Sequence, residues 1–381
     1  MIFSVSFLIV LLVSCSKEGE TVPAPNPPTT DTPTEPEVDL TDLRKKIAVN
    51  VSDGLIIPAY DQLALEVDLL ATTTQNFIEA PNEETLQTAQ TALKDSWLAW
   101  QGAAIYLFGP AETVSLRKSL NTYPTDAHQI ETNIQSGEYT LSSLANQAAI
   151  GFPAIDYLLN GLGDDPSSIV SFYAHDEGSA GRGHYLLQLI GDIQTRVDNT
   201  LNEWKKDKGD YTSRFSEADA LGLDVGSSLS LLVNSMDFHF QRFVRDGKVA
   251  IPTGIRSAGV PRPKAIEAYY GAYSTTLLME SLSTYHDLFL GINSLGEDKE
   301  GLYDYLVAIS AKDLADDMLT QFETTYTKAQ LLTDPLNQQI EDDIDKMTGV
   351  FIEMQKLVVF FKSDMASIMG ISITNQDNDG D

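Results

Sequence analysis

The spacing of apolar side chains over residues 41–370 constrains the fold more than any other feature of this sequence. These side chains recur at steps of three and four residues, the period of an α-helix that buries one face. No run of alternating β-branched residues bounded by turns interrupts the pattern, so nothing predicts a sheet. We therefore expect an all-α protein. The clearest stripes are Leu86, Leu93, Trp97 and Trp100; Leu186, Leu189, Ile193 and Trp204; Leu229, Leu232, Met236, Phe240 and Phe243; Ile266, Tyr269, Tyr273 and Leu277; and Ile340, Ile344, Met347, Phe351 and Met354.

Breaks in this pattern predict how the helices are grouped. The segment from Gly161 to Gly183 is rich in glycine and turn residues, and we place a boundary there between two bundle-like helical halves, 41–174 and 180–370. About 330 residues suffice for two hydrophobic cores. Pro58 should kink or split a first helical segment over 41–79, because proline has no N–H and clashes with the preceding turn.

The two ends of the chain lack the helical pattern of residues 41–370, which we call the body. Residues 1–15 combine a short apolar run with Leu12-Val13-Ser14-Cys15, the form of a lipobox, and Cys15 is the only cysteine in the sequence. We expect a lipoprotein signal peptide and a lipid on Cys15. Residues 16–40 are rich in proline, threonine and acid and predict a disordered tether. Its first acidic residues resemble the surface-export signal of Bacteroidetes lipoproteins. Residues 371–381 form an acidic tail that contains the first half of a calcium loop.

The net charge of −30 limits the partners of the protein. A surface of this sign repels phosphate backbones, which argues against binding to nucleic acid. The charge favours cations or cationic partners, and it also has the simpler interpretation of keeping the protein soluble.

Few residues form a pattern typical of catalysis or metal binding. The five histidines include no pair at helical ligand spacing, and there is no His-Glu-x-x-His, P-loop or Gly-x-Ser-x-Gly motif. One spacing is suggestive. His128 and Glu131 lie three residues apart on a helix expected over 125–135, with Asp126 just before it, and could ligate a metal. The alternative is that both are solvated surface residues.

Two segments of the chain repeat one pattern. Residues 153–161 and 263–271 each run from a proline through Ala-Ile-acid and an apolar pair to a glycine, which sets Asp156 against Glu267. A duplicated helical bundle would explain this, and so would chance.

Several motifs together resemble the imelysin-like proteins. They occur in the order of that family and extend over nearly the whole body: Trp97–Trp100, Phe108–Glu112, Asn121–Asp126 and Gly151–Gly161. The resemblance implies an all-helical fold of two bundle-like halves. It also implies an envelope protein, often a lipoprotein, tied to bacterial iron uptake, with iron or another divalent cation as the candidate cofactor. The family carries the label of peptidase M75, because its founding member was described as a peptidase.

The sequence departs from the family at its signature, Gly-x-His-x-x-Glu. Gly151 is present, but Pro153 replaces the histidine and Asp156 replaces the glutamate. Proline has no lone pair for a metal and no proton to transfer. Chemistry that needs that imidazole is therefore lost unless another residue substitutes, for which His128 with Glu131 is the candidate. A structural role survives better, because proline is tolerated in the first turn of a helix.

By resemblance, the signature segment faces the junction of the two halves and marks a ligand site there. We assign to this site Gly151, Pro153, Asp156, Tyr123, Asp126 and Arg242. If Asp156 is buried it needs a partner, for which the candidates are Arg242, Arg245 and Tyr123.

Three functions are compatible with these observations. The first is a non-enzymatic binding protein, lipid-anchored at the outer membrane on its periplasmic or cell-surface face, that assists iron or haem uptake. The second is a peptidase of the M75 type. The third is a structural partner of an outer-membrane transporter that binds no ligand of its own.

Overall fold

The computed structural model describes residues 38–374 and contains helices and turns, with one isolated β-bridge between Ile292 and Asp298 and no strand in that range. The expected all-α class is confirmed. The predicted signal peptide with Cys15, the tether up to residue 37 and the calcium-like tail from residue 375 lie outside the described residues. The α-helices within residues 38–374 are α1 (Leu40–Val49), α2 (Ile57–Glu79), α3 (Glu83–Ala103), α4 (Pro110–Thr113), α5 (Leu116–Leu120), α6 (Ala127–Ser136), α7 (Gly151–Asn160), α8 (Pro166–Ala174), α9 (Ser179–Trp204), α10 (Tyr211–Ser216), α11 (Ser228–His239), α12 (Ser274–Leu290), α13 (Leu302–Ala308), α14 (Lys312–Ala329), α15 (Leu336–Asp342), α16 (Ile344–Val359) and α17 (Ala366–Met369).

Three π-helical segments continue α-helices without a break in the chain. They are η1 (Asn50–Ile56), η4 (Phe240–Ala250) and η6 (Phe360–Met365), and short 3₁₀ turns occur at η2 (Leu144–Asn146), η3 (Ala218–Ala220) and η5 (Pro263–Ala265). η1 separates α1 from α2 just before Pro58, which lies in the first turn of α2. Proline has no N–H to donate to the preceding turn, and its ring clashes with a carbonyl of that turn. The wider turn of the π-helix accommodates both effects. The expected irregularity at Pro58 is thus confirmed.

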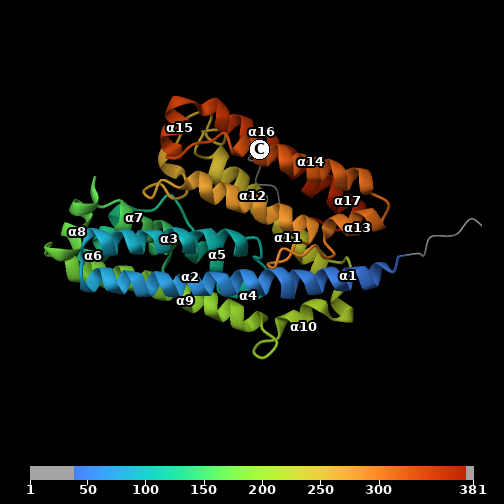
Figure 1. Ribbon diagram of the computed structural model, residues 1–381, viewed down its shortest axis with the longest axis horizontal. Helices are drawn as coiled ribbons and strands as arrows, with labels where there is room; N and C mark the ends of the chain where they lie inside the picture. The colour runs from blue at the N-terminus through green and yellow to red at the C-terminus, as the bar shows by residue number, and fades with distance from the viewer. Residues whose placement is uncertain (1–37, 375–381) are drawn as a thin grey trace, which may run out of the picture. The chain divides into compact units, whose positions relative to one another are not determined.

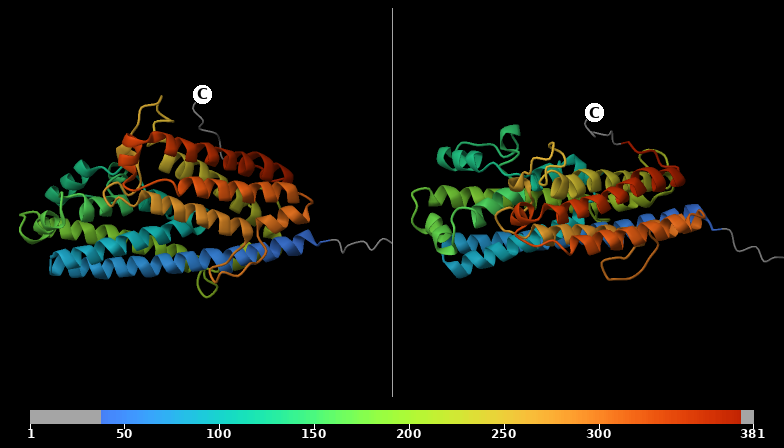
Figure 2. Two further views of the ribbon diagram at one scale, coloured as in Figure 1. Left: turned by 45° about the horizontal axis from the view of Figure 1, so that its top comes forward. Right: turned by 90° about the horizontal axis from the view of Figure 1, so that it is seen from above.

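The helices pack in two neighbouring groups (Figures 1 and 2). α2, α3 and α9 lie side by side with α7 against them, and α12, α14 and α16 pack with η4 in the second group. α3 also contacts α12 and so joins the groups. α9 belongs by sequence to the predicted second half, yet it packs along α2 and α7. The boundary between the halves stays a prediction.

A continuous hydrophobic core extends through both groups, from Leu43 to Ile371. Trp97, Trp100 and Trp204 are among its largest side chains and are fully buried. They occupy the apolar stripes that predicted α3 and α9. Within residues 38–374, none of the helices has the length and apolar character that crossing a bilayer requires.

One predicted stripe is wrong in part. Ile266, Tyr269 and Tyr273 were expected to lie on a helix with Leu277, but α12 begins only at Ser274, and residues 266–273 form turns. Ala268 and Ala272 adopt positive φ angles of 52° and 55°, which a right-handed helix excludes. This segment, which we call the 266–273 turn, is held in place by two buried carboxylates.

Candidate functional site

The signature segment forms α7, whose first residue contacts the end of α5. Gly151 has a φ of 77°, and a Cβ at this position would lie 2.3 Å from the carbonyl oxygen of Leu120. Only glycine allows this approach without strain. Pro153 follows in the first turn of α7, where a backbone N–H would have no partner within the helix. The proline therefore fits the helix without loss of a hydrogen bond.

Asp156 is buried beneath the 266–273 turn. Its side chain is 1 % exposed and accepts hydrogen bonds from the backbone N–H of Tyr270 at 3.0 Å and from Asn160 Nδ2 at 2.9 Å. Burial raises the pKa of Asp156 to about 7, and hydrogen bonds from Tyr270, Asn160 and the backbone of Gly271 oppose this. Asp156 therefore joins α7 to a turn that lies more than a hundred residues further along the chain.

The expected partners of Asp156 were wrong. The candidates were Arg242, Arg245 and Tyr123, but backbone and amide N–H groups satisfy the carboxylate instead. Arg245 is buried and forms an ion pair with Asp246, at 2.8 Å from Nε to Oδ1, and donates to Gln355 Oε1 at 2.8 Å. Arg242 lies exposed on η4. A backbone donor from a distant turn carries no signature in side-chain spacing, which is why the sequence could not reveal it.

Glu267 is the second buried carboxylate of the 266–273 turn. It forms an ion pair with Lys248 of η4, and Asn121 Nδ2 donates to its Oε1 at 2.6 Å. Gln101 contacts both partners, since its Nε2 donates to Glu267 at 3.2 Å and its Oε1 accepts from Lys248 at 2.9 Å. Burial lowers the pKa of Lys248, and Glu267 counteracts this. The network ties α3, η4 and the turn together.

Glu267 was not among the residues predicted for the site, although the sequence contains a signal for it. The two repeated segments align Asp156 with Glu267, and these two acids are both buried and both fix the same turn. The repeated segments also touch, because the rings of Tyr157 and Tyr270 lie 5.3 Å apart. Only the first copy is helical, so the structure does not show a duplicated bundle at this position.

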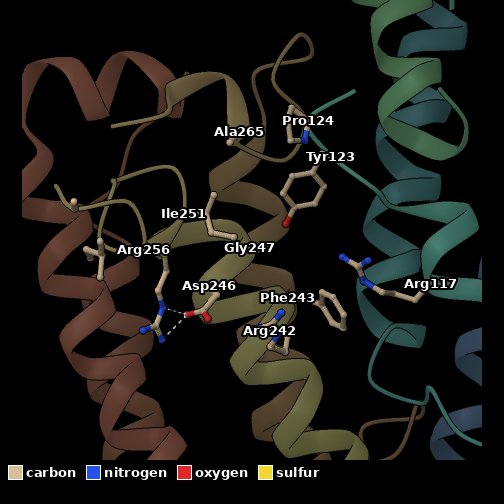
Figure 3. A pocket seen from close by; sticks show the side chains of 12 residues that line it. Arg117, Tyr123, Pro124, Arg242, Phe243, Asp246, Gly247, Ile251, Arg256 and Ala265 are labelled. Carbon is tan, nitrogen blue, oxygen red and sulfur yellow. Dashed lines mark hydrogen bonds and ion pairs between the residues drawn. The ribbon is translucent and has the colours of Figure 1, made fainter. Parts of the chain in front are cut away.

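Two cavities flank the segment Tyr123-Pro124, which contributes to the walls of both. The smaller, of about 410 Å³, is lined by Pro153, Asp156, Lys264, Tyr269 and Tyr270 among others. The larger, of about 540 Å³, lies between α5 and η4 and is shown in Figure 3. We call it the arginine pocket because its lining includes Arg117, Arg242 and Arg256. Of the assigned site residues, Tyr123, Pro153 and Asp156 thus lie together, and Arg242 lies in the neighbouring cavity.

The remaining assigned residues lie away from both cavities. Asp126 caps α6, since its Oδ1 accepts from the backbone N–H of Gln129 at 3.0 Å. His128 is exposed on α6, and Glu131 forms an ion pair with Arg182 at 3.3 Å and accepts from Tyr157 at 3.0 Å. A metal at His128 and Glu131 would have to displace Arg182. No group of three or more His, Cys, Asp or Glu side chains suited to a metal occurs between residues 38 and 374.

The all-helical arrangement matches solved structures over nearly their whole length. A crystal structure of a putative iron-regulated protein A precursor from Parabacteroides distasonis superposes with a TM-score of 0.71 at 16% identity, covering 89% of this chain and 97% of that one. An imelysin-like protein from Psychrobacter arcticum gives 0.68 at 18% identity, covering 88% and 98%. This chain therefore has the same helical fold as these two proteins.

The family model of imelysin, peptidase M75, matches residues 56–350, and the chain belongs to this family. A curated relative, iron-regulated protein A of Synechococcus elongatus, is 23% identical over 155 residues, which are 40% of this chain. The match spans 38% of the length of that relative.

Proposed function

We propose that this protein is a cell-envelope binding protein, anchored to the outer membrane by a lipid on Cys15, that assists iron or haem uptake without cleaving peptides. Membership of the imelysin family and the likeness to proteins named for iron regulation support the link to iron. The lipobox at Cys15 supports the anchor.

The chemistry of Pro153 and the hydrogen bonds of Asp156 in the signature segment are the main support for this proposal. Pro153 offers neither a proton nor a lone pair, and both carboxylate oxygens of Asp156 accept hydrogen bonds from within the protein. A hydrolase needs a base within reach of a water or a nucleophile, and the signature segment supplies none. Two cavities lie beside the signature segment and could hold a ligand, and Asp156 forms part of the wall of one of them. Binding is therefore the activity that this site supports best.

The role in iron uptake is tested by expression. Protein levels, followed by immunoblot, should rise when cells are starved of iron by a chelator and fall when iron is restored. Unchanged levels under both conditions would contradict the link to iron.

The absence of peptidase activity is tested with the purified protein. We expect no cleavage of casein or of the insulin B chain over a day at neutral pH. Cleavage that Asp156→Asn abolishes would show that the family label describes this chain.

Calorimetry separates a binding protein from a purely structural partner of a transporter. Titration with haem and with Fe³⁺ complexes should release or absorb heat in a saturable way. A protein that takes up none of these compounds, yet is retained with a transporter from the same membrane, would favour the structural role.

A further inference from the structure

The arginine pocket concentrates positive charge in a strongly acidic protein. Its lining holds three arginines, Arg117, Arg242 and Arg256, and one acid, Asp246, a formal net charge of +2 on a chain whose net charge is −30. Asp246 is already shared, since its Oδ1 accepts from Arg245 at 2.8 Å and from Arg256 Nη2 at 3.1 Å. The pocket therefore has more cationic groups than the protein itself neutralises.

Arg117 is the least compensated of these groups. It is half-buried, its guanidinium lies 3.4 Å from the centre of the Phe243 ring, and within residues 38–374 no hydrogen bond or ion pair joins its side chain to another group. The pKa of Arg117 is lowered to about 10, chiefly by burial and to a lesser degree by the like charge of Arg242, whereas Tyr123 and Glu267 act to raise it. The side chain remains charged at neutral pH. An unpaired, partly desolvated guanidinium gains strongly from an anion with two oxygens in one plane.

The position of Arg117 is maintained by its neighbours. Phe243 supports one face of the guanidinium, and Tyr123 lies beside it (Figure 3). Gly247 lets Tyr123 approach η4, because a Cβ on Gly247 would lie 2.9 Å from the Tyr123 hydroxyl. The π-helical segment η4 brings Arg242, Phe243, Asp246 and Gly247 to the same wall. The donors are therefore preorganised, which reduces the entropy that a ligand must overcome.

The size of the pocket and the spacing of its arginines indicate the ligand. Figure 3 shows Arg117 and Arg256 on opposite sides of the cavity, with Arg242 and Phe243 between them. A volume of about 540 Å³ exceeds what a single phosphate or sulfate would fill. Apolar side chains of Phe243, Ile251 and Ile255 form part of the lining. These features suit several anionic groups on one carbon frame.

We propose that the arginine pocket binds a polycarboxylate, a compound with two or more carboxylates on a short carbon frame. A second part, that the polycarboxylate carries iron into the pocket, rests on the proposed role in iron uptake. Three guanidinium groups repel a bare cation, so iron would enter this pocket as an anionic complex with a polycarboxylate. The first part, binding of the metal-free polycarboxylate, stands independently of iron.

The test is calorimetric titration of the full-length protein, in detergent, with citrate as the metal-free probe. Each variant side chain loses a charge-assisted hydrogen bond to the ligand, so Arg242→Gln should weaken citrate binding by about tenfold or more and Arg117→Gln/Arg242→Gln by about a hundredfold or more. Arg214→Gln is the matched control, because Arg214 is exposed and does not line the pocket. Its affinity should equal that of the unaltered protein.

Several results would overturn the polycarboxylate site. These are no citrate binding at millimolar concentration, equal binding by the double variant while it retains the helical circular dichroism of the parent, or tighter binding of inorganic phosphate than of citrate. Arg242→Gln keeps the test valid if the double variant fails to fold, since Arg242 is exposed. If citrate binds through the arginines but the ferric citrate complex does not, the polycarboxylate site stands and its link to iron fails.

Discussion

At the residue scale, Asp156 shows how burial and hydrogen bonding change the role of a signature position. The carboxylate is held in an apolar helix by the backbone of a distant turn and by Asn160, and its pKa is raised because burial outweighs these donors. Pro153, three residues before Asp156, fits the first turn of α7, and its side chain has no group that could donate or accept a proton. Both residues therefore help to determine the shape of the site.

The raised pKa of Asp156 predicts a pH dependence of stability. The folded state binds the proton with a pKa of about 7, whereas the ordinary value is 3.8, so the contribution of Asp156 is fully present below about pH 4 and is lost as pH rises to about 7. In Asp156→Asn this dependence should disappear. At pH 4.5 the variant should unfold about 1–3 kcal/mol more easily, because its amide replaces one acceptor by a donor.

Urea denaturation of both proteins between pH 4.5 and 7.5 measures this effect. The difference in unfolding free energy between the parent and Asp156→Asn should shrink as pH rises across that range. Asn160→Ala serves as a comparison, since it removes one donor and keeps the titrating group. Parallel pH profiles for parent and Asp156→Asn would show that Asp156 does not titrate in this range.

At the scale of elements, the site depends on contacts between segments of different secondary structure. α7 is a regular helix, while its sequence counterpart is a 3₁₀ turn, η5, followed by the 266–273 turn. η4 is a π-helix that contacts that turn, and it carries both Lys248, the partner of Glu267, and Arg242 of the arginine pocket. π-helical segments often occur at functional sites, and here the segment forms a wall of the pocket.

The ion pair between Lys248 and Glu267 should be essential for this arrangement. Lys248→Met leaves the carboxylate of Glu267 buried without a cation, and we expect the free energy of unfolding to fall by about 3–5 kcal/mol. Glu267→Gln in the same chain removes the uncompensated charge and keeps an acceptor for Asn121. The double variant should therefore recover part of the loss in urea denaturation. Equal stability of the single and double variants would argue against a coupled pair.

At the scale of the whole molecule, one hydrophobic core joins the two groups of helices. It runs from Leu43 to Ile371, and α3 contacts both α2 in one group and α12 in the other. The end of the described range is joined to α11, because the backbone N–H of Thr374 donates to Asn234 Oδ1 at 2.7 Å.

The continuous core predicts one cooperative thermal transition, because the two groups cannot lose their packing separately. Differential scanning calorimetry, with circular dichroism at 222 nm recorded in parallel, should give a single coincident transition. Two resolved transitions would instead support independent cores in 41–174 and 180–370.

The lipobox predicts that the protein is anchored through Cys15. Cys15→Ala should move the protein from the membrane fraction to the soluble fraction, since no other signal for a lipid occurs in the sequence. Cell fractionation and immunoblotting measure this, with Ser14→Ala as the control that keeps the acceptor cysteine. A variant without Cys15 that stays in the membrane fraction would contradict the anchor.

The sequence by itself determined the all-helical class and the irregularity at Pro58. Both follow from residues close together in the chain, because helix periodicity and proline geometry are local properties. Its motifs also indicated the imelysin family. The tertiary structure alone decided that Tyr270 is the partner of Asp156, that Ile266 belongs to a turn, and that Arg117 and Arg242 share a pocket. Asp156 and Tyr270, like Arg117 and Arg242, lie more than a hundred positions apart in the sequence, and the free energy of such contacts depends on burial and on backbone donors that no spacing of side chains records.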